Sequence, residues 1–115
     1  MKNITRSYKD LVVWQKGIAL ASFPAAEKFG LVAQMRRAAV SIPSNIAEGQ
    51  ARHTTGEFIQ FISHAEGSLA ELDTQLIISV ELDICREAKA SPAFQLIEEE
   101  RRMLNSLRRK LRARS

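Results

Sequence analysis

Hydrophobic side chains recur at steps of three and four residues along most of this chain, which is the spacing of amphipathic α-helices. The first helical segment is expected from about Asp10, as its N-cap, to about Ser22. Its apolar stripe consists of Leu11, Trp14, Ile18 and Ala21. The stretch SFPAAEKFG, which contains Pro24 and Gly30, then interrupts the pattern and predicts a break between helices.

A second helical segment begins near Leu31, and a proline lies within it. Its apolar stripe consists of Leu31, Met35, Ala38, Ile42 and Ile46. The stripe keeps its phase across Pro43, which a loop would not do. The stretch SIPSNIAEG (41–49) is therefore interpreted as part of a bent helix rather than as a catalytic loop.

The bend is expected because Pro43 cannot donate a hydrogen bond to the carbonyl of Ala39 and its ring clashes there. The carbonyl that it frees needs a donor. Water or nearby polar side chains could help to satisfy the hydrogen bonds of this region. The nearby side chains are those of Ser41, Ser44 and Asn45. Gly49 is the expected C′ residue, which ends the helix.

The third helical segment is the longest. Thr54 and Glu57 form a capping-box pattern, and no proline follows before Pro92. The apolar seam repeats as in a left-handed bundle and consists of Phe58, Ile62, Ala65, Leu69, Leu72 and Leu76. A helix from Thr55 to Ile84 would be about 45 Å long, whereas the first helix would span only about 20 Å. The third helix must therefore overhang a neighbour.

A fourth segment is expected to start with Ser91 as N-cap and Pro92 at the first helical position. Its apolar stripe consists of Ile97, Leu104, Leu107 and Leu111, and fraying is expected beyond Leu111. Glutamates 98–100 precede the arginines, an order that suits the helix dipole. The sequence thus predicts an all-α protein with four helices, a kinked second helix and a long third helix.

Apolar residues spread over more than one face at both ends of the third segment. They are Phe58, Ile59, Phe61 and Ile62 at one end and Leu76, Ile77, Ile78, Val80 and Leu82 at the other. The core of one copy cannot easily cover so wide an arc, and exposed apolar surface usually marks association. We therefore expect a homo-oligomer.

Composition places the chain among globular proteins of one domain. It has 115 residues, of which 45% are hydrophobic and 26% charged. We expect a single domain over residues 1–115, with an N-terminal arm at about 1–9 and a frayed basic tail at about 112–115. Cys85 is the only cysteine, and neither a signal peptide nor a 20-residue apolar run is found, so we expect a cytoplasmic protein without membrane contact.

Three stretches carry a family resemblance: YKDLVVWQK (8–16), GLVAQMRRAAVSIPSNIAEG (30–49) and AEGSLAELDTQL (65–76). They resemble the four-helix-bundle proteins first noted as reading frames in intervening sequences of bacterial 23S ribosomal RNA genes. The resemblance runs from Tyr8 to about Leu107. It implies an up-down-up-down antiparallel four-helix bundle and a ring of subunits, most often five.

A related branch of this family serves as the accessory protein of diversity-generating retroelements, where it binds the reverse transcriptase and nucleic acid. The family's first helix is usually longer, by roughly two turns, than the stretch between Ile18 and Phe23 allows. The resemblance therefore implies a shortened first helix in this chain.

Catalytic and metal-binding patterns are not found in the sequence. A di-metal bundle needs paired Glu-x-x-His motifs, but Gln50 and Phe61 stand three residues before His53 and His64. Cys85 lies at an apolar helix end, where it is expected to pack rather than react. No phosphate-binding glycine loop occurs either. We therefore expect neither an enzyme, nor a metal, nor a cofactor.

A set of polar residues shares the facing sides of the second and third helices. It consists of Asn45, Glu48, Ser68, Glu71 and Gln75. These residues could line a ligand pocket, or they could form an interhelical hydrogen-bond network that fixes the register, aided by close backbone approach at Gly67. We favour the network.

Positive charge is concentrated at the C-terminus. Residues 1–100 contain 10 basic and 13 acidic side chains, whereas residues 101–115 contain 7 basic and no acidic side chains. The candidate nucleic-acid-binding residues are Arg36, Arg37, Arg52, Arg101, Arg102, Arg108, Arg109, Lys110, Arg112 and Arg114. Such residues bind phosphates in a salt-dependent manner, but they could equally form a solvated face or internal salt bridges.

Two functions remain open from the sequence. In the first, a non-enzymatic homo-oligomer binds RNA or other nucleic acid through its basic surface. In the second, the protein is an interaction scaffold, for example a partner of a reverse transcriptase. Few aromatic residues accompany the C-terminal cations, so the sequence does not support base stacking there.

Overall fold

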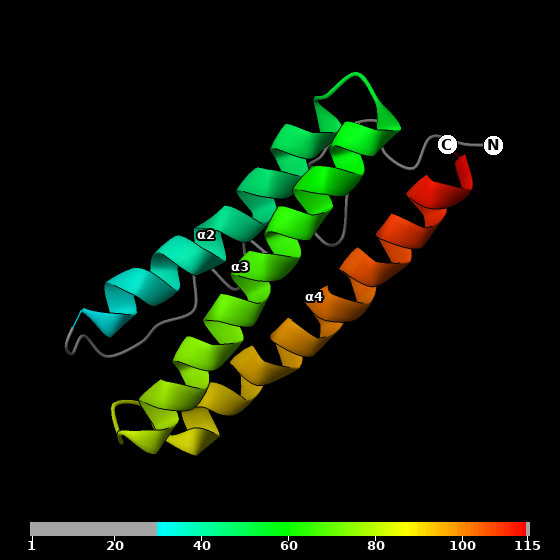
Figure 1. Ribbon diagram of the computed structural model, residues 1–115. Coiled ribbons are helices and arrows are strands. Elements are labelled where there is room, and N and C mark those ends of the chain that lie inside the picture. Colours follow the sequence, from blue (N-terminus) through cyan, green and yellow to red (C-terminus); the bar gives the residue numbers. More distant parts are fainter. Residues whose placement is uncertain (1–29, 115) are drawn as a thin grey trace.

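The computed structural model describes residues 30–114. These residues form three α-helices, namely α2 (Leu31–Gln50), α3 (Thr55–Glu81) and α4 (Glu87–Arg114), and the described part contains no strand (Figure 1). The predicted all-α class is therefore confirmed. The expected N-terminal arm and first helix lie outside the described residues, so the four-helix architecture stays a prediction.

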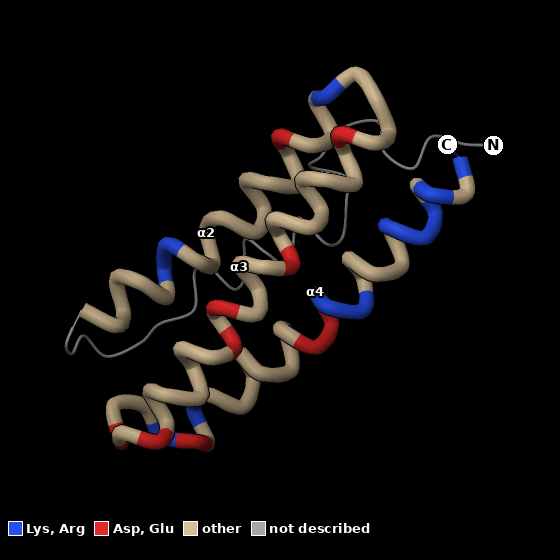
Figure 2. The backbone as a smooth tube through the Cα atoms, in the orientation of Figure 1, with Lys and Arg blue, Asp and Glu red and all other residues tan. Residues whose placement is uncertain are grey.

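Successive helices run antiparallel, and α3 lies between the other two (Figure 1). α3 packs against both α2 and α4, whereas no Cα atoms of α2 and α4 approach within 8 Å of each other in the described chain. α3 is therefore the central element of the described structure. The last turns of α2, the first turns of α3 and the last turns of α4 share one end of the molecule, which we call the basic end (Figure 2).

α2 continues through Pro43 without a break, as the phase of its stripe predicts. Ile42 and Ile46 are fully buried, and Pro43 is buried between them. The side-chain amide of Asn45 donates to the Ser41 carbonyl at 2.8 Å rather than to the Ala39 carbonyl that the proline leaves without its helical donor. The helical interpretation of residues 41–49 is thus confirmed.

Gly49 does not end α2, which corrects the sequence expectation. The helix continues to Gln50, and Gly49 does not have a positive φ. A Cβ atom on Gly49 would lie 2.7 Å from the Cβ of Phe61 and 3.0 Å from a ring carbon of Phe58. Glycine is therefore needed here because α2 and α3 approach closely, not because the helix needs a left-handed cap.

α3 begins where the capping box places it. The Thr54 hydroxyl accepts a hydrogen bond from the Glu57 backbone N–H at 3.1 Å and donates to the Glu57 carboxylate at 3.0 Å. All six residues of the predicted seam are buried and belong to the hydrophobic core.

The helix ends at Glu81, three residues before the expected Ile84. Asp83 takes a left-handed conformation with φ of 59°, and the Ile84 N–H donates to the Ser79 carbonyl at 2.8 Å. The Asp83 N–H donates to the Val80 carbonyl at 3.0 Å. These two bonds form a Schellman motif with aspartate in the position usually held by glycine.

α4 begins at Glu87 rather than at Pro92, so the expected N-cap at Ser91 is wrong. The Ala90 N–H donates to the Arg86 carbonyl at 3.0 Å, which closes the first turn before the proline is reached. Pro92 then lies within the helix, where it removes one backbone hydrogen bond. The helix also extends past Leu111 to Arg114, so the expected fraying beyond Leu111 is not seen. Arg112 and Arg114 in the last turn favour the longer helix because cations there interact well with the helix dipole.

The three helices share one continuous hydrophobic core. Its fully buried members include Ile42 and Ile46 of α2, Ile62 of α3, and Leu104 of α4. Among the described residues the exposed large apolar side chains are Val40, Ile77, Ile78 and Leu82. Three of these four lie at the C-terminal end of α3, where the apolar residues cover a wide arc, and they leave apolar surface open to solvent.

Candidate nucleic-acid interface

Two ion pairs join α3 to α4. Arg108 pairs with Glu66 and also donates to the Ser63 hydroxyl at 3.0 Å, while Arg101 pairs with Asp73 at 3.5 Å. Each pair is displaced from the other by seven residues in both helices, and the displacements run in opposite directions, as antiparallel packing requires. Arg101 and Arg108 therefore connect helices in addition to contributing positive charge.

Arg101 and Arg108 differ in how far they reach into solvent. The side chain of Arg108 is only 15% exposed, whereas that of Arg101 is 45% exposed and also pairs with Glu98. Both guanidinium groups are compensated by carboxylates. Of the predicted nucleic-acid-binding residues, Arg108 is accordingly the least available to a phosphate.

Arg52 has a different environment, at the turn between α2 and α3. Its guanidinium donates to the Glu48 carboxylate at 3.0 Å and lies 4.7 Å from the centroid of the Phe61 ring. Glu48 is thereby engaged on the surface of α2, with its side chain 55% exposed, and takes no part in the polar network that the sequence analysis assigned to it.

The remaining cations of α4 extend into solvent. We call four of them the exposed cations of α4: Arg102, Arg109, Lys110 and Arg114. None of the four forms an ion pair with a carboxylate of the described residues within 4.0 Å. Arg112 is exposed in the same turns. Arg102 and Arg109 are seven residues apart on one face of the helix, which separates their Cα atoms by about 10 Å along the axis.

The predicted basic residues do not all meet at one place. Arg52 and the last turns of α4 lie at the basic end, whereas Arg36 and Arg37 lie in the N-terminal half of α2 (Figure 2). Because α2 runs toward the basic end, these two arginines are exposed nearer the opposite end of the bundle. The sequence could not distinguish these locations, since they depend on the direction of each helix.

The polar network between α2 and α3 is centred on a residue that the predicted set omits. The hydroxyl groups of Ser41 and Ser68 lie 2.8 Å apart, and the Asn45 amide donates to the Ser41 hydroxyl at 2.9 Å. Gln75 donates to the Glu71 carboxylate at 3.3 Å within α3. The signal for Ser41 was its place one turn before Asn45, on the same side of the helix.

A groove of about 420 Å³ lies over this network, lined by Gln34, Arg37, Ala38, Ser41, Ser68 and Glu71. The expected role of Gly67 is not seen, because a Cβ atom on Gly67 would meet no described atom within 4 Å. Close approach of α2 and α3 occurs at Gly49 instead. The hydroxyl pair therefore joins the helices at a place where polar groups, not a glycine, form the contact.

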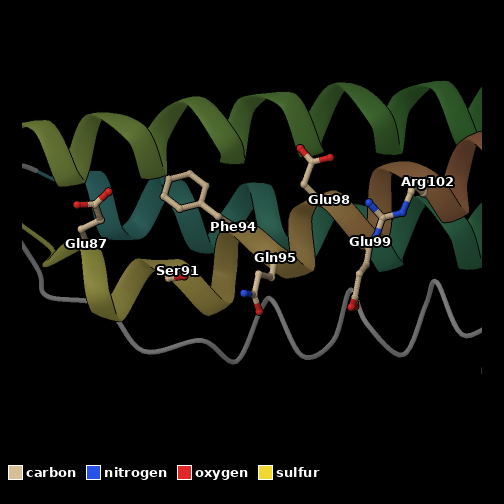
Figure 3. Close-up of a pocket in the computed structure, with 7 residues that line it drawn as sticks. All are labelled: Glu87, Ser91, Phe94, Gln95, Glu98, Glu99 and Arg102. Carbon is tan, nitrogen blue, oxygen red and sulfur yellow. The ribbon is translucent and has the colours of Figure 1, made fainter.

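A second hollow, of about 470 Å³, lies along the N-terminal half of α4 and is lined by Glu87, Ser91, Phe94, Gln95, Glu98, Glu99 and Arg102 (Figure 3). Phe94 and Glu98 point toward α3, whereas Gln95 and Glu99 point away from it (Figure 3). The two neighbouring carboxylates thus diverge, and they do not form the convergent pair that acid–base chemistry requires. Along α4 the charged residues change from acidic to basic between Glu100 and Arg101.

Glu100 is a buried carboxylate that the sequence analysis did not single out. It is fully buried within α4, on the same face as Ile97 and Leu104. Its position was visible in the sequence, since it fills the gap between these two residues at steps of three and four. Hydrophobicity alone does not reveal a charged residue that lies on an apolar stripe.

Possible metal ligands are dispersed over the described residues. No group of three or more His, Cys, Asp and Glu side chains in residues 30–114 is placed to hold a metal ion. His64 instead packs edge-on against Phe61, with ring centroids 5.6 Å apart. None of α2, α3 and α4 is long and apolar enough to cross a membrane.

Comparison with known families gives a match over most of the chain. Residues 9–106 match the family described as 23S rRNA-intervening sequence protein. The chain belongs to this family. The match spans α2, α3 and most of α4, and it leaves out the last turns, in which Arg108, Arg109, Lys110, Arg112 and Arg114 lie. A search of curated proteins found no match to this chain.

Proposed function

We propose that this member of the 23S rRNA-intervening sequence protein family is a non-enzymatic homo-oligomer that binds RNA or other nucleic acid through its basic end. The observation that carries the proposal is the set of exposed cations of α4, which lack a carboxylate partner among the described residues. Exposed cations without a carboxylate partner in residues 30–114 can approach phosphates without first giving up an ion pair there, and binding releases the counterions condensed on the nucleic acid.

Self-association would strengthen this binding. Ile77, Ile78 and Leu82 are exposed near the α3–α4 turn, which supports burial against another subunit. Each subunit of an oligomer would present the same cations, so that weak contacts act together on one nucleic acid. A ring of five subunits is the form that the family resemblance favours.

The test is a salt titration of RNA binding by fluorescence anisotropy, with a hairpin RNA as probe. We expect binding at about 50 mM salt and a linear fall of log K with log salt concentration, with a slope of about 0.9 for each phosphate contacted. Absence of binding at about 50 mM salt would contradict the proposal. Sedimentation of the same sample tests the oligomer, because a monomer at micromolar concentration would exclude it.

A protein-interaction scaffold is the second candidate. It is favoured by the same exposed apolar side chains together with Val40, which is 51% exposed on α2. A reverse transcriptase is one partner that the resemblance to retroelement accessory proteins implies. Purification from the native host with nuclease present distinguishes the two functions, since a protein partner that survives nuclease treatment supports the scaffold.

A further inference from the structure

A cationic and aromatic cluster lies at the basic end, away from α4. Its members are Arg52, Phe61 and His64, which come from the α2–α3 turn and the first turns of α3. The Arg52 guanidinium lies over the Phe61 ring at 4.7 Å, and His64 meets the same ring edge-on at 5.6 Å with an interplanar angle of 71°. Planar groups arranged in this way are the elements with which proteins stack unpaired nucleic-acid bases.

Packing and ion pairing hold this cluster in place. Phe61 is fixed against α2 because Gly49 lacks a side chain, and any Cβ at position 49 would overlap the Phe61 Cβ at 2.7 Å. Arg52 is held by the Glu48 carboxylate at 3.0 Å, one turn back on α2. A preorganised surface loses little conformational entropy when a ligand binds to it.

The surface beside His64 is open. His64 is exposed, and Gly67 follows it at the i+3 position, which is adjacent on a helix surface. A Cβ atom placed on Gly67 meets no described atom within 4 Å. The helix surface one turn beyond His64 therefore carries no side chain.

We propose that the Arg52–Phe61–His64 cluster, with the open surface at Gly67, is a stacking site for one unpaired base of a nucleic acid. The inference rests on the proposed function, because the cations at the same end attract the phosphate backbone and the cluster then receives a base. It adds a ligand class, a nucleic acid with an extruded or single-stranded nucleotide. This differs from the C-terminal cations alone, which do not distinguish paired from unpaired strands.

The test compares two RNA hairpins that differ only in one bulged nucleotide, 2-aminopurine, whose fluorescence falls on stacking. The native protein is expected to bind the bulged hairpin more tightly and to quench its emission. His64→Ala is expected to reduce the preference for the bulge by about fivefold or more, the effect of losing one stacked base. Binding of the hairpin without the bulge is expected to stay unchanged.

Three further variants separate stacking from charge and folding. His64→Trp keeps a stacking surface and should retain the preference, whereas Arg52→Lys keeps the charge and should lose part of the preference without changing the salt dependence. Gly67→Gln fills the open surface and should weaken binding of the bulged hairpin only. His53→Ala is the matched control, since it removes an exposed histidine at the same end without touching the cluster.

The outcomes are distinguishable from those of the proposed function. Equal affinity for the two hairpins, unchanged 2-aminopurine emission, or an equal effect of His53→Ala and His64→Ala would overturn the stacking site while leaving duplex binding intact. Failure to bind either hairpin at low salt would instead overturn the proposed function. Circular dichroism of each variant confirms that the helices are retained.

Discussion

Arg108 of α4 and Glu66 of α3 form an ion pair across the helix interface, and the Ser63 hydroxyl accepts a second hydrogen bond from the same guanidinium at 3.0 Å. The side chains are 15% and 32% exposed, so water screens this pair less than it screens a fully exposed pair. A residue that the sequence presents as part of a basic tail is therefore a connection between two helices. This distinction leads to the first prediction.

Removal of the Arg108–Glu66 interaction should destabilise the fold. We expect a double-mutant cycle with Arg108→Met and Glu66→Gln to give a coupling free energy of about 1 kcal/mol, at the upper end of the range for surface ion pairs because this pair is partly buried. Urea denaturation measures it. The Arg101–Asp73 pair is the internal control, because its arginine is 45% exposed and its coupling should be smaller, about 0.5 kcal/mol or less. Equal coupling in both pairs would show that burial does not decide their strength.

Gly49→Ala should destabilise the protein although alanine is the better helix former. The new Cβ would overlap the Cβ of Phe61, and neither backbone can move without disturbing the α2–α3 contact. We expect a net loss of about 1–3 kcal/mol in the free energy of unfolding, as for other overpacked positions. Thermal and urea denaturation test this prediction.

The matched control for Gly49 is Gly67→Ala. Position 67 also lies in a helix, but its Cβ would enter open space. This substitution should therefore stabilise the fold by up to about 1 kcal/mol, the difference in helix propensity between the two residues. If both substitutions changed stability in the same direction, the close approach at Gly49 would not be the cause.

Asp83→Gly should stabilise the turn between α3 and α4. Asp83 has φ of 59° at the C′ position of a Schellman motif, where glycine has no steric cost. We expect a gain of about 0.5–1 kcal/mol, and a loss of about 1 kcal/mol for Asp83→Val, because a β-branched residue is poorly tolerated there. Denaturant midpoints of the two variants should move in opposite directions.

Neutralising the exposed cations of α4 should weaken RNA binding. Replacing Arg102, Arg109, Lys110 and Arg114 with glutamine is expected to lower the slope of log K against log salt by about 3.6, which is about 0.9 for each of the four lost phosphate contacts. Stability should change little, since these side chains are exposed. Anisotropy titrations at several salt concentrations measure the slope.

The control for this charge removal is the double variant Arg36→Gln, Arg37→Gln. These residues are exposed on α2, away from the basic end, so their loss should change the slope by much less than the loss of the α4 cations. An equal loss of slope for each charge removed at either position would indicate attraction by total charge rather than binding at one end.

The hydrophobic period was sufficient to predict most of the helical architecture that the structure describes. The six seam residues from Phe58 to Leu76 are buried as their spacing requires, and Ile42 and Ile46 remain buried on either side of Pro43. These predictions succeed because each depends only on neighbours within one helix. The start of α3 was predictable for the same reason, since Thr54 and Glu57 are three residues apart.

Features that depend on two helices could not be predicted in this way. Gly49 was expected to end a helix, but glycine is required there because Phe61 of the next helix approaches its backbone closely. Glu48 was assigned to an interhelical network, but it forms an ion pair with Arg52, which lies one turn further along the chain. The start of α4 was misplaced because Pro92 is a strong local signal, and the helix tolerates it within its second turn.

The arrangement of the α3–α4 ion pairs has a consequence for movement between these helices. Because Arg101–Asp73 and Arg108–Glu66 have the same spacing, a shift of α4 along α3 by one turn would break both at once. Asp73, Glu66 and Arg108 would lose these partners, whereas Arg101 would keep Glu98 on its own helix. Gradual sliding is therefore opposed, and α4 either keeps its position or separates. The exposed cations of α4 would then stay at constant distances from the α2–α3 turn, and the nucleic acid of the proposed function would bind to a rigid surface.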